Sequence, residues 1–189
     1  MAASLVSIWN LALVPLGAER VMDPLEDTES ARKCNAVWEQ IRDDEMSSHP
    51  WNFATTRIQL ALSTTTPTYD YSYAHQLPSD ALRILELEGL EDYKVEGDKV
   101  LSNQSIVKCR YIKLITDPLS YSSQFVSLVA ARLQFELAYS LTDSSTAMER
   151  LFAVYEKKKK IAKAVDAQEG TPVNAIGDRW IDARSGVVH

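Results

Sequence analysis

Carboxylate side chains are the first candidates for chemistry in this sequence, because they gather in two short clusters. One cluster is Asp43, Asp44 and Glu45, and the other comprises Glu86, Glu88, Glu91 and Asp92. A pair of carboxylates can perform acid–base chemistry on a glycosidic bond, provided that a cleft holds the sugar and one acid is desolvated. The sequence signals neither condition, and clustered acids usually form a solvated surface. We therefore predict solvent-exposed faces at both clusters.

The histidines and cysteines do not follow a metal-ligand pattern. His49, His75 and His189 lie in unrelated contexts, and Cys34 and Cys109 are far apart. Structural zinc sites and phosphate-binding loops need closely spaced ligands or glycine patterns that this sequence does not contain. We expect no catalytic residue, no metal and no cofactor, and hence a protein that is not an enzyme. Both cysteines are predicted to be buried free thiols, with a disulfide between them as the alternative.

Four consecutive lysines, Lys157, Lys158, Lys159 and Lys160, form the sharpest local concentration of charge. Consecutive helical residues spread around most of the circumference, so Lys158 is predicted to lie in the apolar seam of its helix. One interpretation is that the lysine stems cover apolar surface where the helix leaves its packed region. The others are contact with an acidic neighbour or with nucleic acid. A net charge of −6, a pI near 5.1 and the absence of aromatics within the run argue against nucleic acid.

The C-terminal residues contain a tryptophan between a basic and an apolar residue, in a stretch too short to form its own core. The residues concerned are Arg179, Trp180, Ile181 and Arg184. Trp and Arg dominate the hot spots of protein interfaces. Two interpretations stay open: the stretch folds back onto its own domain, or it is an arm that anchors Trp180 on a partner.

A helix over residues 118–141 is predicted to be the element around which the others pack. Asp117 is the expected N-cap, and Pro118 suits the first helical position. Apolar residues follow at helical spacing on two stripes: Val126, Val129, Ala130, Leu133 and Leu137, and then Phe125, Leu128, Phe135 and Tyr139. Arg132 and Glu136 mark the one strip expected to face water or a neighbouring subunit.

Three further helices are predicted, over about 4–14, 28–47 and 144–167. Ser4 and Asp27 are the expected caps of the first two. Residues 143–146 offer several caps for the last helix, and Thr146 with Glu149 is spaced as a capping box. The seam of the last helix is predicted to be Ala147, Leu151, Val154, Ile161 and Val165. Three further residues widen it: Met148, Phe152 and Tyr155.

Between these helices, alternation of period two over residues 51–115 predicts an antiparallel β lobe. The expected strands are 58–62, 69–73 and a bulged strand at 82–87, then a hairpin over 93–101 with Gly97 and Asp98 at its tip, and 107–115. The fold class is therefore α+β: mainly a bundle of about four helices with a small inserted antiparallel β lobe. Residues 1–168 form a single domain, and 169–189 an extended C-terminal arm.

No apolar run reaches the roughly 18 residues of a membrane span. The N-terminal residues 5–16 could imitate a signal peptide, but no Lys or Arg precedes them and Asn10 interrupts them. A short buried helix is the stronger interpretation, which predicts a protein that stays in the cytoplasm of the cell that makes it.

Several strings, in this order, give the chain a resemblance to a family. They are Asn10-Leu-Ala-Leu-Val-Pro-Leu-Gly17, His49-Pro-Trp-Asn-Phe-Ala54 with Arg57, Leu77-Pro-Ser-Asp-Ala-Leu-Arg83, and Arg110-Tyr111 before the Asp117 helix. Over roughly residues 3–168 the chain resembles the head-to-tail adaptors of short-tailed bacteriophages, known as tail tubular protein A. The C-terminal arm matches that family least well.

The resemblance implies a structural subunit that joins the portal to the tail nozzle. Members assemble as a ring, a dodecamer, beneath the portal protein, and a C-terminal segment reaches onto the portal. Expected partners are further copies of this chain, the portal, a nozzle protein similar to tail tubular protein B, and tail fibres. DNA would only pass through the lumen, no membrane would be bound, and the protein would be located in the virion after assembly in the host cytoplasm.

Two hypotheses about residues follow. Arg179, Trp180, Ile181 and Arg184 would carry the portal contact, and either Asp43–Glu45 or Lys157–Lys160 would lie at the seam between subunits. Two alternatives for function stay open. One is a virion-associated enzyme that degrades peptidoglycan with a carboxylate such as Glu45 or Glu88, and the other is a non-viral helical binding module.

Overall fold

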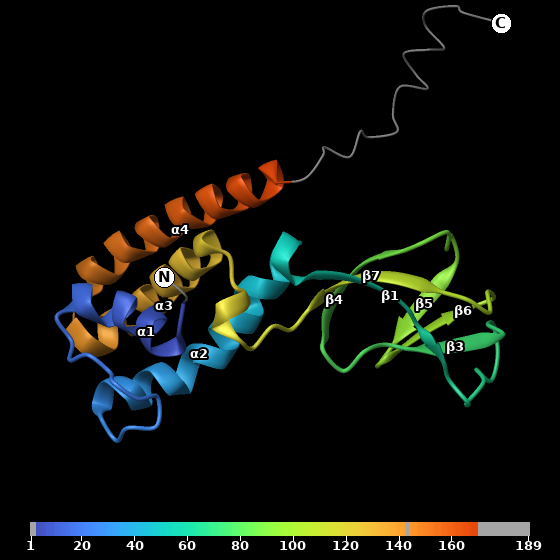
Figure 1. Cartoon of the computed structure of the whole chain (residues 1–189), viewed down its shortest axis with the longest axis horizontal. Coiled ribbons are helices and arrows are strands. Elements are labelled where there is room, and N and C mark those ends of the chain that lie inside the picture. The colour runs from blue at the N-terminus through green and yellow to red at the C-terminus, as the bar shows by residue number, and fades with distance from the viewer. Residues whose placement is uncertain (1–2, 143, 170–189) are drawn as a thin grey trace, which may run out of the picture.

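The computed structural model describes residues 3–142 and 144–169. It has an α+β fold, in which a helical bundle and a small β lobe lie end to end (Figure 1). The sequence-based prediction of the fold class is thus confirmed. The β strands lie between the second and third helices of the chain, so the lobe is an insertion into the bundle.

The bundle contains four α-helices within the described residues. They are α1 (Leu5–Leu13), α2 (Glu29–Ser47), α3 (Ser123–Thr142) and α4 (Ser145–Gln168). Three short 3₁₀ segments accompany them: η1 (Val14–Leu16), η2 (Asn52–Ala54) and η3 (Pro118–Ser120). The cap at Ser4 is confirmed, because its hydroxyl accepts a hydrogen bond from the Ser7 amide at 3.1 Å.

Two other predicted caps are wrong, and the cap of α4 lies within the predicted range. Asp117 caps the 3₁₀ turn η3, and α3 begins only after Ser122, whose hydroxyl accepts from the Phe125 amide at 3.2 Å. Thr28 caps α2, since it accepts from the Ala31 amide at 3.2 Å while Asp27 pairs with Arg32 instead. Ser144, one of the residues expected to offer a cap, caps α4 by accepting from the Ala147 amide at 3.2 Å, whereas Thr146 of the expected capping box lies inside the helix. In each case two or three adjacent residues could serve as caps, and tertiary packing selected among them.

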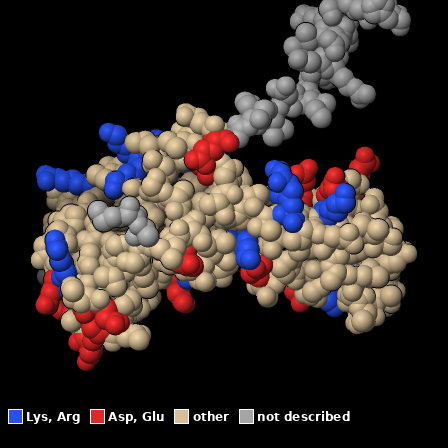
Figure 2. Space-filling view, viewed as in Figure 1, with Lys and Arg blue, Asp and Glu red and all other residues tan. Residues whose placement is uncertain are grey.

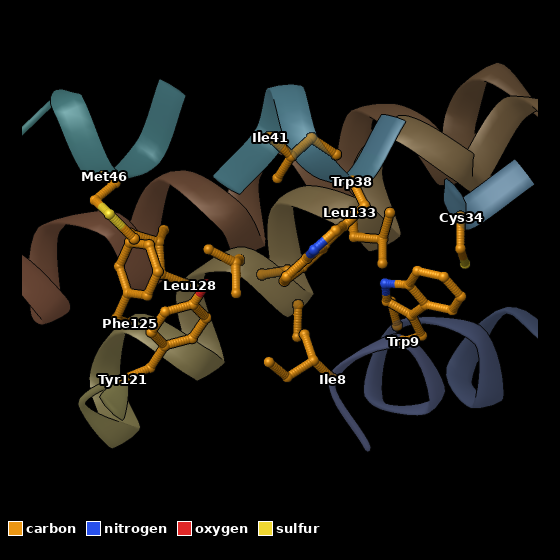
Figure 3. Close-up of a cluster of buried hydrophobic side chains, with 14 of the residues drawn as sticks. Ile8, Trp9, Cys34, Trp38, Ile41, Met46, Tyr121, Phe125, Leu128 and Leu133 are labelled. Carbon is orange, nitrogen blue, oxygen red and sulfur yellow. The ribbon is translucent and has the colours of Figure 1, made fainter. Parts of the chain in front are cut away.

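Helix α3 is the centre of the bundle, as predicted. Phe125, Leu128, Val129 and Leu133 are fully buried. In Figure 3, Trp9 of α1 points toward Cys34 of α2, and the Trp9 and Trp38 rings meet edge to face with centroids 6.5 Å apart. Tyr139 differs from its predicted place in the apolar stripe, since it is 57% exposed. Arg132 and Glu136 are half-buried and paired at 2.5 Å.

The β lobe consists of two antiparallel sheets. The first has the strand order β1-β7-β4, built from β1 (Thr55–Gln59), β7 (Lys108–Lys113) and β4 (Ala81–Leu87). The second has the order β2-β3-β6-β5, built from β2 (Ala61–Leu62), β3 (Tyr73–Gln76), β6 (Lys99–Ser102) and β5 (Tyr93–Glu96). A small apolar cluster fills the lobe, with Leu60, Val100 and Val107 among its buried members.

Most of the predicted details of the lobe, and the predicted state of both cysteines, are confirmed, and one predicted strand is wrong. The hairpin with Gly97 and Asp98 at its tip is confirmed, and β4 has the register shifts of a bulged strand. Cys34 and Cys109 are buried free thiols, as predicted. The expected strand at 69–73 is wrong, because only Tyr73 belongs to a strand and the backbone turns at Asp70 with φ 65°. Tyrosines at alternate positions imitate a strand whether or not the chain has a partner to pair with.

The first sheet connects the two parts of the molecule. Ile112, on β7, is buried in the core of the bundle, whereas Cys109 and Tyr111 of the same strand belong to the core of the lobe. The residues between α2 and β1 form the other connection, and Trp51 there packs against Phe125 of α3 with ring centroids 5.2 Å apart. The junction is thus a packed region of the structure and not a bare linker.

Candidate functional site

Glu45, at the C-terminal end of α2, is buried and bonded within the chain. Its side chain is 4% exposed, and Oε1 accepts a hydrogen bond from the Tyr155 hydroxyl at 2.5 Å. The indole N–H of Trp51 donates to the Glu45 carbonyl at 2.8 Å. The prediction that residues 43–45 form one solvated face is therefore wrong for Glu45. A carboxylate is retained in such a place only when donors and an opposite charge compensate for the lost water.

Lys159 of α4 supplies the opposite charge. Its Nζ donates to the Tyr155 hydroxyl at 2.7 Å and lies 3.8 Å from Oε2 of Glu45. Burial disfavours the charged ammonium, but the hydrogen bond to Tyr155 and the carboxylate of Glu45 together raise the pKa of Lys159. Burial, and then the hydrogen bond to Glu45, raise the pKa of Tyr155, so its hydroxyl stays protonated and donates. This group of three side chains fastens α4 to α2.

The same contacts correct the predicted orientation of the last helix. The buried face of α4 runs through Tyr155, Ala162 and Asp166, one residue beyond the centre of the predicted seam, which Tyr155 was expected only to widen. Lys159 consequently turns inward, whereas Lys158, which the sequence placed in the seam, is exposed. The polar spacing Tyr155, Lys159 and Asp166 follows one helical face, and this was a signal available in the sequence.

A second group of polar side chains attaches the end of α4 to the junction between the bundle and the β lobe. The Asp166 side chain accepts from the Asn52 amide at 3.1 Å and contacts Nε2 of His49 at 3.1 Å. The Asn52 side chain donates to the Asp166 carbonyl at 2.6 Å. Burial is the largest effect on His49 and lowers its pKa; Lys163 and Arg83 act in the same direction, whereas Asp166 opposes them. His49, Asn52 and Asp166 therefore work as a structural clasp.

The outer flank of α4 carries apolar and basic side chains together. Val154 and Ile161 are 43% and 46% exposed, and Lys158 lies between them at helical spacing. Lys157, Lys158 and Lys160 are exposed, and none of them forms an ion pair within the described part of the chain. This flank, from Val154 to Ile161 with its lysines, is called the α4 flank below. Asp44 also faces outward, and Asp43 pairs with Arg42 at 2.7 Å.

A groove of about 410 Å³ lies along the first sheet of the β lobe. Arg57 and Arg110 stand opposite each other on β1 and β7, and Arg110 pairs with Glu86 at 2.9 Å. Glu88 pairs with Lys108 at 3.1 Å, and both side chains are largely exposed. The exposed face predicted for this acidic cluster is confirmed at Glu86 and Glu88. The groove presents paired charges rather than a desolvated acid.

The remaining candidates divide into those with a described place and those without one. Arg179, Trp180, Ile181, Arg184 and His189 lie outside the described residues. His75 is fully buried, with its Nε2 2.9 Å from the Gln104 carbonyl oxygen. Across residues 3–142 and 144–169, no group of His, Cys, Asp and Glu is arranged to hold a metal ion. Nor does any helix described there have the length and apolar character needed to cross a membrane.

Comparison with known proteins adds no relative to this picture. No protein-family model matches the chain, and no curated protein matches it. The features that call for a function are therefore those of the structure itself. One is helix α4, which is bonded to α2 and to the junction and carries an apolar and basic flank, and the other is the charged groove of the β lobe.

Proposed function

We propose that this protein is a structural subunit of a phage head–tail connector, the adaptor that joins the portal to the tail nozzle. Copies of the chain assemble into a ring around the passage for DNA, and the ring belongs to the virion after assembly in the host cytoplasm. The proposal combines the resemblance of residues 3–168 with the surface of α4.

The single observation that supports the proposal most strongly is the α4 flank. Val154 and Ile161 are large apolar side chains left nearly half exposed beside three lysines without ion-pair partners among the described residues. Because Glu45, Tyr155 and Lys159 fasten α4 to α2, this flank is rigid before any partner arrives. A preorganised surface loses little conformational entropy on association, which favours assembly.

The arrangement of the two lobes supports the same function. The β lobe extends from the bundle (Figure 1), so that each subunit offers one region for contact with its neighbours and another for the next tail component. A net charge of −6 suits a wall that DNA slides past, since phosphate groups are repelled from an acidic surface. Lys159 contributes nothing to the seam between subunits in this proposal, because it is committed to Glu45 and Tyr155 within the chain.

The arm is proposed to provide the portal contact through Arg179, Trp180, Ile181 and Arg184. Affinity capture from phage-infected cells, with the full chain and with residues 1–174 as baits, tests both the function and this role. We expect the full chain to retain a portal protein and a tail protein, and the truncated chain to lose the portal. Circular dichroism of both baits controls for folding.

The result of the capture has three clear readings. Loss of the portal on truncation supports the adaptor and its arm, while retention by both baits supports the adaptor and removes the arm from the contact. If neither bait retains a virion protein, the connector is wrong. Hydrolysis of peptidoglycan by the purified chain in a zymogram would instead favour the enzyme.

A further inference from the structure

The loop between α1 and α2, residues 18–28, is built to hold one conformation. The Asn10 side chain bonds both the carbonyl and the amide of Val21, at 2.8 and 2.9 Å, and Val21 is fully buried. The Glu26 carboxylate accepts from the amides of Met22 and Asp23 at 3.0 and 3.1 Å. A loop fixed at both ends and across its middle is preorganised for a contact.

This loop displays two large apolar side chains to solvent. Met22 is 81% exposed and Leu25 is 92% exposed, the highest value among the exposed large hydrophobic residues described. The backbone on either side of Leu25 is held, because Asp23 accepts from the Leu25 amide at 2.8 Å and Asn35 donates to the Pro24 carbonyl at 2.7 Å. Exposed apolar residues on mobile loops are ordinary, but on a fixed loop they form a protruding contact surface.

The loop and the α4 flank carry opposite charges. Residues 18–28 contain four carboxylates and one arginine, a formal net charge of −3. The α4 flank, residues 154–161, carries three exposed lysines and one glutamate, a net charge of +2 when the inward-turned Lys159 is left out. In Figure 2, acidic side chains gather at the lower-left corner of the bundle, and basic ones lie on the left part of its upper edge, with an acidic group farther along that edge. Two surfaces that are each apolar at the centre and opposite in charge at the rim are complementary.

The two surfaces also lie on opposite edges of the bundle, with α4 along one edge and the α1–α2 loop at the other (Figure 1). A single chain therefore cannot bring them together, but two copies can. Contact between two different faces of identical subunits is heterologous, and it generates a ring when the rotation between subunits closes. The occupant of each surface is then a second copy of this chain.

We propose that Met22 and Leu25 of one copy dock on the Val154–Ile161 flank of α4 in the next copy. The acidic rim of the loop faces the lysines of the flank. This inference rests on the self-assembly that the proposed function requires, and it names the two surfaces that meet. It also assigns Lys157 and Lys158 to a partner outside their own chain.

Site-directed disulfide formation tests the contact directly. Full-length L25C and I161C chains are mixed at high concentration and oxidised, and the 25–161 cross-linked dimer is quantified on non-reducing gels. A disulfide needs Cα atoms within about 7 Å, so only a specific contact gives a high yield. The native thiols do not interfere, because both are buried, and burial raises the pKa of Cys34 to about 12.

The matched control pairs L25C with L119C, since Leu119 is 64% exposed and lies outside α4. Each single variant is also oxidised alone. The contact is supported if the 25–161 dimer forms in about tenfold excess over both controls, because only a pair held within disulfide distance reacts efficiently. Equal yields for the two pairs, or no cross-link at all, would overturn it.

Charge exchange gives an independent test. We expect E19K, which changes an exposed carboxylate of the loop, and likewise K157E with K158E, to weaken self-association in sedimentation velocity, and the mixture of the two variant chains to restore it. A mixture that stays as weak as its components argues against the contact. The substitutions M22S and L25S together should lower the association constant about tenfold, while L119S leaves it unchanged.

The outcomes separate this inference from the proposed function. If the chain retains virion proteins but yields no specific 25–161 disulfide, the adaptor stands and this contact is wrong. If the disulfide forms but no virion protein is retained, the chain assembles with itself and the connector is wrong.

Discussion

The helical bundle and the β lobe are stabilised in different ways. The bundle surrounds a continuous core that includes Trp9, Trp51, Phe125 and Leu133, each fully buried. The lobe encloses a much smaller cluster, and ion pairs such as Lys108 with Glu88 lie exposed on its surface. Burial of apolar side chains is the dominant favourable term in folding, and surface ion pairs add little. Most of the free energy of unfolding must therefore reside in the bundle.

This difference suits the two regions to different tasks. A rigid bundle can hold the α4 flank and the α1–α2 loop in fixed relative positions, which a closed ring requires. A lobe with a small core and exposed strands can adjust to a second partner at a lower energetic cost. Trp51 and Ile112, at the junction, hold the lobe in place relative to the bundle, since both side chains are fully buried in the core of the bundle.

The strongest test of this comparison places a charge in each core. Leu133→Asp should lower the free energy of unfolding by more than about 4 kcal/mol and abolish the helical signal in circular dichroism, because the carboxylate is buried without a partner. Val100→Asp in the lobe should leave that helical signal largely intact and remove amide protection from β3, β5 and β6. Tyr139→Asp is the control on α3, and it should be tolerated because Tyr139 is exposed. Loss of all helix in Val100→Asp would show that the two regions fold as one unit.

Within the bundle, the attachment of α4 depends on a polar contact rather than on apolar burial alone. Tyr155→Phe removes the hydroxyl that donates to Glu45, so a buried carboxylate oxygen loses its donor. We expect a loss of about 1–3 kcal/mol in the free energy of unfolding, with faster hydrogen exchange concentrated in α4. Tyr139→Phe removes an exposed hydroxyl and should change stability by less than about 0.5 kcal/mol. Equal effects of the two substitutions would mean that the contact with Glu45 contributes nothing.

The fold was predictable from the sequence where local patterns coincide with packing. Apolar residues at helical spacing located the bundle, and alternation of period two located the inserted lobe with its hairpin at Gly97. Both patterns work because these elements bury their apolar faces against the nearest layer. Asp117 and Asp27 were wrong as helix caps, and the cap of α4 was located only to within residues 143–146, since neighbouring residues of similar type compete for that position. The strand expected at Tyr69 and Tyr71 failed because pairing depends on residues far away in the chain.

The candidate site was less predictable, for a related reason. Glu45 and Lys159 were each noted as members of charge clusters, but nothing local shows that they meet across more than a hundred residues. Their contact depends on the rotation of α4, and a shift of one residue in the buried face moves Val154 and Ile161 from the core to the surface. The exposed apolar flank appeared only when the helix was oriented by Tyr155 and Asp166.

A destabilising substitution in the lobe is expected to affect only the strands around it, whereas one in the core of the bundle should destabilise the whole bundle. Gly97 has φ 58° at the tip of the β5–β6 hairpin, a conformation in which a side chain is strained, and no atom lies within 4 Å of where a Cβ would be. Gly97→Ala should therefore cost roughly 1 kcal/mol, from the backbone alone. Gly97→Asn is the matched variant, and it should cost less because Asn tolerates this region. Hydrogen exchange should increase in β5 and β6 only; an increase in α3 would contradict the separation of the two regions.

The smallest expected effect concerns the junction, where His49 contacts Asp166. The pKa of His49 is lowered in the folded chain from its ordinary value of 6.5, chiefly by burial, with Lys163 and Arg83 in support and Asp166 opposed. The unfolded chain therefore binds a proton more readily, and the stabilising contribution of neutral His49, complete above pH 6.5, declines as the pH falls toward the folded pKa. Its titration by NMR should give a midpoint below the ordinary value, and His49→Gln should flatten the pH dependence of unfolding in this window.

A raised midpoint for His49 would reverse that conclusion. The ion pair with Asp166 would then outweigh burial, and its stabilisation would be complete below pH 6.5 and lost as the pH rises through the folded pKa. Asn52→Ala distinguishes the two cases, because it removes a hydrogen bond to the Asp166 carbonyl without adding a charge. If burial controls His49, loosening the clasp in this way should let water in and bring the midpoint back up toward its ordinary value. If the ion pair controls it, the same loosening should bring a raised midpoint down.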